Sequence, residues 1–368
     1  MLDFDVIIVG GGIAGASLGA EIAATRRTLI LEAEDQCGYH STGRSAAFYL
    51  ESYGGEEVSR LTAASGKFLD HPPRDFAEHS FLHRRGALHL SDREWPEVPP
   101  DVTAWRVDRD ELERILPGLR SHWVRALFEP GCADIDVAGL HAAFLRQFKR
   151  RGGTIATNSR LVGAIWSGDR WRVRLADGSE RGAALLVDAA GAWADNVAEA
   201  CGVQPLGIEP KRRTMVQLRV GHTGLKDLPL VNDSGGQFYF KGEGDNSIWL
   251  SPHDEIASDP CDAAPDEIDI ATTIDRFEGV VDWPVERVER SWAGLRTFAP
   301  DRLPVYGFDT RVPGFFWCAG QGGFGIQTSP AAARLAASLL LGEAPDSMIA
   351  DIDPAVFSPA RFDQNSGG

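Results

Sequence analysis

The stretch Val6-Ile-Ile-Val-Gly10-Gly-Gly12-Ile-Ala-Gly15, with Glu32 further on, decides the fold of this chain. An apolar run leads into a glycine-rich turn, and a second apolar run at residues 28–31 ends at the acid. We predict a buried strand, the turn, a helix that begins near Ile13, and a second strand. This order of elements is the opening βαβ unit of a dinucleotide-binding fold.

Each residue of this pattern has a physical task in binding a dinucleotide. Gly10 permits the tight turn, Gly12 lets the backbone approach the pyrophosphate, and Gly15 lets the helix pack closely against the sheet. The phosphates would accept hydrogen bonds from free N–H groups at the positive end of the helix dipole. Glu32 lies where the second strand delivers a carboxylate to a hydroxyl of the adenosine ribose. We therefore expect the chain to bind a dinucleotide.

The composition limits the size, the partners and the location of the protein. At 368 residues the chain exceeds one typical core, so we expect two structural domains. The formal charge of −16 argues against nucleic acid or an anionic membrane as a partner, because both require a basic face. The five cysteines lack CxxC spacing, and no metal site is predicted. No secretory signal and no apolar run of about 18 residues are visible, so we predict a cytoplasmic protein without a membrane span.

Two further glycine-rich turns follow apolar strand patterns later in the chain. One lies at residues 189–195 and the other at residues 320–325. Residues 37–55 are small and polar with interleaved aromatics, and we expect an irregular loop there that lies along the cofactor. Residues 208–300 have the alternation of antiparallel strands and predict an inserted domain. The predicted helices are residues 58–69, 108–116, 139–151, 266–279 and 329–341.

The first glycine turn with Glu32, the loop at residues 37–55 and the two later turns resemble, in order and spacing, the glycine-oxidase/D-amino-acid-oxidase (DAO) family of flavoproteins. Within that family the chain is most similar to bacterial D-arginine dehydrogenases. The similarity covers essentially the whole chain. The strings that carry it include Gly38-Tyr-His-Ser-Thr-Gly-Arg-Ser-Ala-Ala47, Trp292-Ala-Gly-Leu-Arg296 and Gln321-Gly-Gly.

The resemblance implies an α/β fold with two domains. We expect a Rossmann-like FAD-binding domain of the glutathione-reductase type, with an inserted substrate-binding domain (α+β) built on an antiparallel sheet. We place the FAD-binding domain at residues 1–80, 136–207 and 303–368, and the substrate-binding domain at residues 81–135 and 208–302.

By the same resemblance the cofactor is FAD rather than NAD. We expect noncovalent FAD, because the cysteine that holds the flavin in sarcosine oxidases is missing from Leu295-Arg296-Thr297. A helix that begins near Ser329 would stabilise the negative charge of the reduced flavin with its N-terminus. The predicted cofactor-binding residues are Gly10, Gly12, Ile13, Ala14, Gly15, Glu32, Ala33, Ser41, Thr42, Arg44, Ser45, Ala46, Gly191, Trp193, Gly322, Gly323 and Gln327.

The substrate end is also assigned by resemblance. Arg213 and Arg296 would hold a substrate carboxylate, which a planar guanidinium matches bidentately. The sequence leaves open whether Arg212 or Arg213 faces the substrate. Tyr53 and Tyr239 would bind the carboxylate with their hydroxyls or close the pocket. The predicted catalytic set is Arg213, Arg296, Tyr53, Tyr239 and Gly323, and strand alternation places Tyr239 opposite to Phe238 and Phe240.

Two positions depart from the D-arginine dehydrogenases. Ala87 stands where their glutamate binds the substrate guanidinium, and Phe48 stands where they have a histidine. Losing one partner of a buried ion pair costs about 3–5 kcal/mol, so we do not expect D-arginine as the substrate. Glu51 is an alternative source of the lost charge from the other side of the pocket.

We predict FAD-dependent oxidative deamination of a D-amino acid with an uncharged side chain. A hydride would leave Cα for N5 of the flavin, and water would hydrolyse the imino acid to a 2-oxo acid and ammonia. Oxidation of a secondary amine or N-methyl amino acid, as in sarcosine oxidases, and dehydrogenation of a 2-hydroxy acid are alternatives on the same fold. A flavin-binding scaffold and an NAD-dependent dehydrogenase are further alternatives. The electron acceptor, oxygen or a quinone, is left open.

Overall fold

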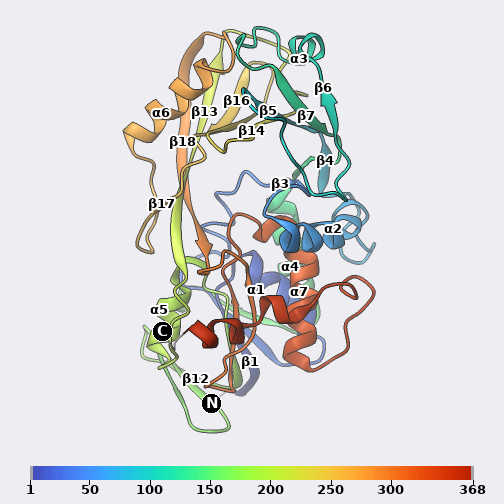
Figure 1. Cartoon of the computed structure of the whole chain (residues 1–368). Coiled ribbons are helices and arrows are strands. Elements are labelled where there is room, and N and C mark those ends of the chain that lie inside the picture. Colours follow the sequence, from blue (N-terminus) through green and yellow to red (C-terminus); the bar gives the residue numbers. More distant parts are fainter. Residues whose placement is uncertain (1–2, 366–368) are drawn as a thin grey trace.

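The computed structural model describes residues 3–365 and has two parts, each built on its own sheet (Figure 1). Residues 1–2 and 366–368 of the predicted FAD-binding domain lie outside the described residues. The eight-stranded sheet has the order β10-β11-β12-β1-β2-β9, and β20 joins β12 and carries β19. Its strands are β1 (Asp3–Val9), β2 (Thr28–Leu31), β9 (Thr154–Ala156), β10 (Leu161–Trp166), β11 (Trp171–Leu175), β12 (Glu180–Asp188), β19 (Val305–Phe308) and β20 (Phe315–Ala319).

The centre of this sheet is parallel and is covered on both faces. Val6 and Ile8 of β1 belong to one apolar core, and Ile7 and Val9 belong to another, because alternate side chains leave opposite faces of a strand. Val9 pairs with Leu31 of β2 and with Asp188 of β12. The carboxyl ends of three neighbouring strands therefore meet at one edge, which is where such sheets bind ligands.

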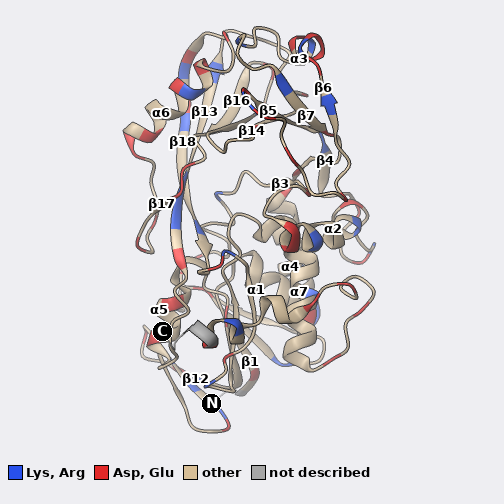
Figure 2. Ribbon diagram, in the orientation of Figure 1, with Lys and Arg blue, Asp and Glu red and all other residues tan. Residues whose placement is uncertain are grey.

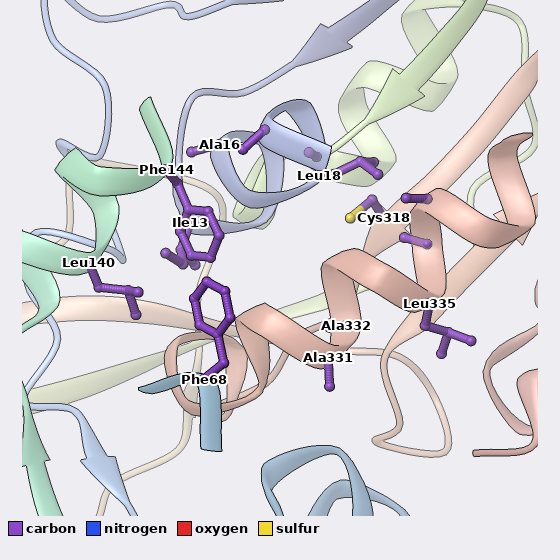
Figure 3. Close-up of a cluster of buried hydrophobic side chains, with 14 of the residues drawn as sticks. Ile13, Ala16, Leu18, Phe68, Leu140, Phe144, Cys318, Ala331, Ala332 and Leu335 are labelled. Atoms are coloured by element: carbon purple, nitrogen blue, oxygen red, sulfur yellow. The ribbon is translucent and has the colours of Figure 1, made fainter. Parts of the chain in front are cut away.

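Helices on one face form the largest core. They are α1 (Ile13–Ile22), α2 (Glu56–Asp70), α4 (Val137–Arg150) and α7 (Gly325–Leu341), and α5 (Ala194–Ala200) covers the other face. Figure 3 shows Phe68 of α2 and Phe144 of α4 beside Ile13 of α1. The rings of Phe68 and Phe144 are stacked with centroids 6.2 Å apart.

Helix α7 begins at Gly325, four residues before the predicted start. Pro330 lies inside this helix and cannot donate a hydrogen bond to the carbonyl of Ile326. The hydroxyl of Ser329 donates to that carbonyl instead, at 2.9 Å. This hydrogen bond allows a proline within the helix. The sequence pattern placed Pro330 near the start of the helix and therefore predicted a start that is too late.

The nine-stranded sheet has the order β17-β13-β16-β15-β14-β5-β7-β6, with β18 along β13. It is antiparallel except that β14 and β5 are parallel. One face packs on its own apolar core with α3 (Arg109–Ile115) and α6 (Glu267–Glu278). Its strands are β5 (Ala87–Ser91), β6 (Trp105–Val107), β7 (Arg125–Glu129), β13 (Glu209–Val220), β14 (Leu230–Asp233), β15 (Tyr239–Gly242), β16 (Ser247–Ser251), β17 (Ile256–Ala257) and β18 (Val285–Phe298).

A three-stranded sheet in the order β3-β8-β4 completes the strand set. Its strands are β3 (Phe48–Tyr49), β4 (Leu82–Arg84) and β8 (Ala133–Ile135), and the 3₁₀ turns are η1 (Gly191–Trp193), η2 (Pro354–Phe357) and η3 (Pro359–Asn365). The presence of β3 corrects the expectation that residues 37–55 contain no regular element. Acidic and basic residues are interspersed along both parts of the molecule (Figure 2). Within residues 3–365, no helix combines the length and the apolar character needed to cross a membrane.

Candidate functional site

A cavity of about 400 Å³ is lined by residues from both large sheets. On the side of the eight-stranded sheet it is lined by the glycine turn after β1, by Glu32 after β2 and by the turn after β12. On the side of the nine-stranded sheet it is lined by Arg213, Tyr239 and Arg296. The residues predicted for a dinucleotide and for a substrate carboxylate therefore share one cavity.

Two glycines of the turn after β1, Gly10 and Gly15, have no room for a side chain. Gly10 has φ +105°, and a Cβ there would overlap the carbonyl oxygen of Ala189. A Cβ on Gly15 would overlap the carbonyl oxygen of Gly10. Gly15 does not line the cavity but lets α1 approach the turn, which confirms the packing predicted for it.

Gly12 is the N-cap of α1 and has no side chain of its own to cap the helix, and the N–H of Ile13 donates to the hydroxyl of Thr42 at 3.0 Å. A Cβ on Gly12 would meet only the hydroxyl of Thr42, at 3.2 Å. Gly12, Ile13 and Ala14 line the cavity, so the positive end of this helix opens into it. The arrangement suits the phosphates of a dinucleotide.

Glu32 is held against this turn. Its Oε2 accepts a hydrogen bond from the N–H of Gly11 at 2.9 Å, and its Oε1 accepts one from the N–H of Glu34 at 3.0 Å. Each carboxylate oxygen keeps a further lone pair, so ribose hydroxyls can still be bound. His141, which the sequence interpretation missed, bonds the carbonyl of Gly11 through Nε2 at 2.9 Å. Burial lowers the pKa of His141, so the neutral ring holds the turn.

The loop around residues 41–46, which we predicted to lie along the cofactor, lines the cavity. The hydroxyl of Ser41 donates to the carbonyl of Leu295 at 2.6 Å. Arg44 lines the cavity, but its guanidinium donates to the carbonyl of Ala263 at 2.8 Å and pairs with Asp262. Arg44 therefore ties this loop to the residues before and within β18. The other cofactor residues predicted beyond the first turn that line the cavity are Ala33, Thr42, Ser45, Ala46, Gly191, Trp193, Gly322, Gly323 and Gln327.

Arg213, not Arg212, lines the cavity. Neighbouring side chains on β13 leave opposite faces of the strand, and Arg212 pairs with Asp269 at 2.7 Å. Arg213 is 4% exposed, and its Nε donates to the carbonyl of Asp254 at 2.7 Å. Its Nη1 and Nη2 are buried without a hydrogen-bond partner among the described residues. The carboxylates of Asp254 and Glu255 lie 3.7 Å from Nε and 3.6 Å from Nη2, but neither accepts a hydrogen bond from Nη1 or Nη2. The two buried donors therefore still need an acceptor.

Arg296 lies beside Arg213 in the same cavity. Burial and then the positive charge of Arg296 lower the pKa of Arg213. Nη1 of Arg296 donates to the hydroxyl of Tyr53 at 2.8 Å. A Cβ on Gly323 would lie 2.9 Å from Cζ of Arg296, so glycine gives the guanidinium its space.

Tyr239 also lines the cavity, while Phe238 and Phe240 lie in the core on the other face, as strand alternation predicted. The hydroxyl of Tyr239 donates to Sδ of Met215 at 3.1 Å. Its ring meets that of Phe48 edge-on, with centroids 6.1 Å apart. The predicted pocket residue Phe48 therefore lines the cavity next to Tyr239.

Ala87 and Glu51, which we predicted in the substrate pocket, do not line the cavity, so that prediction was wrong for both. Ala87 is fully buried in a small apolar cluster with Leu50 and Leu230, which face the cavity in its place. Glu51 accepts a hydrogen bond from the hydroxyl of Tyr49, and neither residue lines the cavity. Glu51 therefore does not supply the charge that Ala87 lacks.

His253 is a site residue that the sequence interpretation missed. It lies in the loop after β16 with φ +56°, and its ring centroid is 5.6 Å from that of Tyr239. Burial, followed by the positive charges of Arg213 and Arg296, lowers the pKa of His253 to about 3. The imidazole is thus neutral beside the two arginines. No motif marks this position, and the one signal is Asp254, the next residue, which supports Arg213.

Comparisons with known proteins identify the family of this chain. The DAO family model, described as FAD dependent oxidoreductase, matches residues 5–339. Glycine oxidase of Pseudomonas aeruginosa is 25% identical and covers 96% of this chain and 98% of its own. D-amino-acid oxidase of Bradyrhizobium diazoefficiens is 24% identical and covers 76% of this chain and 67% of its own. FAD-dependent oxidoreductase domain-containing protein 1 of Xenopus laevis is 28% identical over 48% of this chain, which spans only 38% of that protein.

Solved structures share the fold. L-proline dehydrogenase from P. horikoshii has a TM-score of 0.82 at 19% identity, and the match covers 98% of each chain. L-alpha-glycerophosphate oxidase from Mycoplasma pneumoniae, solved with FAD bound, has a TM-score of 0.81 at 16% identity and covers 93% of this chain and 95% of its own. The mixed α/β fold with parallel and antiparallel sheets is therefore confirmed.

The described residues fit FAD, the cofactor of the matched family. The glycine cradle, the open helix end and Glu32 suit the adenosine and pyrophosphate. A Cβ on Gly191 would meet no atom within 4 Å, so the turn after β12 leaves open space at the cavity wall. All five cysteines are described, and none of them is among the residues that line the cavity.

Proposed function

We propose, from the premise that this chain belongs to the DAO family of FAD dependent oxidoreductases, that it oxidises D-amino acids with uncharged side chains. Oxidation of an amino acid is the activity in the names of two of its relatives, glycine oxidase and D-amino-acid oxidase. The finer proposal is supported by the D-amino-acid oxidase among them and by the strings shared with D-arginine dehydrogenases. We further propose that the FAD is noncovalent.

The observation that carries the proposal is the pair of unpartnered nitrogens on Arg213. Nη1 and Nη2 form a fork that matches the two oxygens of a carboxylate. Arg296, with Tyr53 bonded to it, provides a second cation at the same place. A substrate carboxylate would supply the hydrogen-bond acceptors that Nη1 and Nη2 lack.

Charge argues for an uncharged substrate side chain. Among the described residues that line the cavity, the carboxylates are Glu32 and Glu34, at the dinucleotide end. The wall near Tyr239 is formed by Phe48, Met215 and Leu230. A cationic side chain would enter this wall without a counter-ion, which is costly.

The chain itself contributes position and exclusion of water. Bound FAD would accept the hydride from Cα, and water would hydrolyse the resulting imino acid to a 2-oxo acid and ammonia. Arg213 and Arg296 would fix the carboxylate and so the direction of the Cα–H bond. A displacement of about 1 Å can cost on the order of 100-fold in rate, so this fixing is the main contribution of the two arginines. A substrate whose amine enters neutral needs no protein base.

An anaerobic titration of the purified holoenzyme tests the proposal. The visible flavin spectrum is recorded with D-leucine, D-methionine, D-asparagine and D-arginine, with their L-enantiomers, and with sarcosine, glycine and D-lactate. We expect bleaching by the neutral D-amino acids and little by D-arginine. Bleaching by sarcosine or lactate alone would transfer the proposal to secondary amines or 2-hydroxy acids. Bleaching by D-arginine would refute the charge argument, and no bleaching at all would refute the proposed activity.

A further inference from the structure

Three polar side chains form a row behind the apolar cavity wall. Asn232 of β14 lines the cavity, and its Nδ2 lies 3.4 Å from Nδ1 of His89. Nε2 of His89 lies 3.0 Å from Oε2 of Glu129. His89 is 6% exposed and Glu129 is 2% exposed, so a carboxyl group is buried at the far end of the row.

The sheet register produces this row. Strand β5 lies between β14 and β7, and the three are side by side in Figure 1. Asn232 pairs with His89 across β14 and β5, while Glu129 pairs with Ala87 two residues away. Val231 and Leu88, the neighbours of Asn232 and His89, lie in the apolar core on the opposite face. All three polar side chains therefore leave the sheet on the face toward the cavity.

The row fixes the orientation of the Asn232 amide. In the tautomer in which Nε2 of His89 donates to the carboxylate of Glu129, the single ring proton lies on Nε2. Nδ1 of His89 is then an acceptor, and the amide of Asn232 turns its NH₂ toward it. The Oδ1 of Asn232 is left for the cavity. Without His89 the amide could rotate and present either end.

We propose that Asn232 recognises the substrate side chain, presenting Oδ1 as a hydrogen-bond acceptor whose orientation is set by His89 and Glu129. The favoured substrates carry a neutral donor on the side chain, such as a carboxamide or a hydroxyl. This inference rests on the proposed function, because it assumes that an amino acid is held by Arg213 and Arg296. Asn232 would contact the substrate, and His89 and Glu129 would be positioning residues.

Binding of two nearly isosteric carboxylates to the holoenzyme tests the inference without turnover. Succinamate ends in a carboxamide with N–H donors, and levulinate ends in a methyl ketone without them. Their dissociation constants are measured from the change in the flavin spectrum. We expect succinamate to bind about tenfold more tightly, because levulinate leaves the buried acceptor unpaired.

Variants separate recognition from folding. Asn232→Leu should bring the ratio of the two dissociation constants close to one. His89→Leu should reduce the ratio several-fold, whereas His89→Gln, which keeps a donor toward Glu129, should restore most of it. Binding of propionate, which reaches only the arginines, should be unchanged in all three variants, and thermal melting checks that each is folded. These readings identify an orienting role, since a merely structural residue would weaken all carboxylates equally.

Each outcome has a separate meaning. An equal affinity for the two probes in the unmodified enzyme, or an unchanged ratio in Asn232→Leu, overturns the inference. A tenfold ratio together with a flavin that no D-amino acid reduces supports the recognition role and refutes the proposed reaction. If neither probe nor propionate binds, the carboxylate site is wrong and both proposals fail.

Discussion

Replacement of Arg213 by methionine should weaken substrate binding strongly and the fold only slightly. Methionine keeps much of the length of the arginine side chain but removes the charge and the donors. Because Nη1 and Nη2 have no hydrogen-bond partner, the variant loses one hydrogen bond, from Nε to the carbonyl of Asp254, and the ion pairs with Asp254 at 3.7 Å and Glu255 at 3.6 Å. Asp254 still accepts hydrogen bonds from Thr214 at 2.8 and 2.9 Å, and Glu255 still pairs with Arg302 at 2.9 Å.

The magnitude follows from the hydrogen bonds that the guanidinium fork offers. A hydrogen bond to a charged group contributes about 1.5–3 kcal/mol, so two of them would contribute at least about 3 kcal/mol. That figure corresponds to a loss of about a hundredfold in affinity for a carboxylate. Removal of the buried cation relieves its desolvation cost, which offsets much of the loss of its ion pairs with Asp254 and Glu255. The free energy of unfolding should therefore fall by about 1 kcal/mol or less.

Arg212→Met is the matched control, one residue away on the opposite face of β13. Arg212 pairs with Asp269 at 2.7 Å, so this variant should lose about 1 kcal/mol of stability and keep its affinity. The assays are kcat/KM for the best D-amino acid, the inhibition constant of propionate, and denaturant unfolding of both variants. Equal losses of affinity in the two variants, or a strongly destabilised Arg213→Met, would show that Arg213 is a structural cation and not a carboxylate ligand.

Three further substitutions test other parts of the site. Gly323→Ala places a Cβ 2.9 Å from Cζ of Arg296 and should lower kcat/KM at least about tenfold with normal flavin content, whereas Gly131→Ala, which meets no atom within 4 Å, should change neither value. Gly12→Val should give a folded protein that purifies with little visible flavin absorbance, since its side chain would occupy the place of the phosphates; full flavin content would contradict this reading of the turn. His253→Asn is a suitable variant because asparagine tolerates the left-handed backbone at this position. It should reduce the loss of the free energy of unfolding as the pH falls. The pKa of His253 is lowered to about 3 in the folded state, so its contribution is complete above about pH 6.5 and is lost, at up to about 1.4 kcal/mol per pH unit, as pH falls toward 3. If the free energies of unfolding of the two proteins change equally with pH between pH 7 and 5, this effect is excluded.

The dinucleotide end could be predicted because local sequence determines it. The strand, the turn and the first helix follow each other without a gap. Gly10 is required by its contact with the carbonyl of Ala189, and Gly15 by its contact with the carbonyl of Gly10. Glu32 is placed by the register of β2 against β1, which the parallel pattern implies. The start of α7 could not be predicted, because the hydroxyl of Ser329 compensates for Pro330 in a way that propensity does not express.

The substrate end was only partly predictable. Arg213 and Arg296 could be proposed by resemblance, but the choice between Arg212 and Arg213 needed the register of β13 against β18. His253 and Asn232 come from segments with no motif, and they line the cavity because the nine-stranded sheet and its loops form its wall together with the glycine-rich turns. Their roles depend on partners such as Asp254 and His89 that sequence spacing does not reveal.

The role of a single residue is least reliably inferred from a related family where neighbouring strands together form the pocket wall. Ala87 pairs with Leu230 across β5 and β14, and it is Leu230 that reaches the cavity. A methyl group at position 87 therefore does not leave a hole that water or a cation could enter. The next polar pair along the same two strands is His89 and Asn232, of which Asn232 lines the cavity and His89 lies between it and Glu129. Under the two proposals, this wall would reject a cation, which finds no carboxylate, and would also disfavour a purely apolar side chain, which would leave the acceptor of Asn232 unpaired.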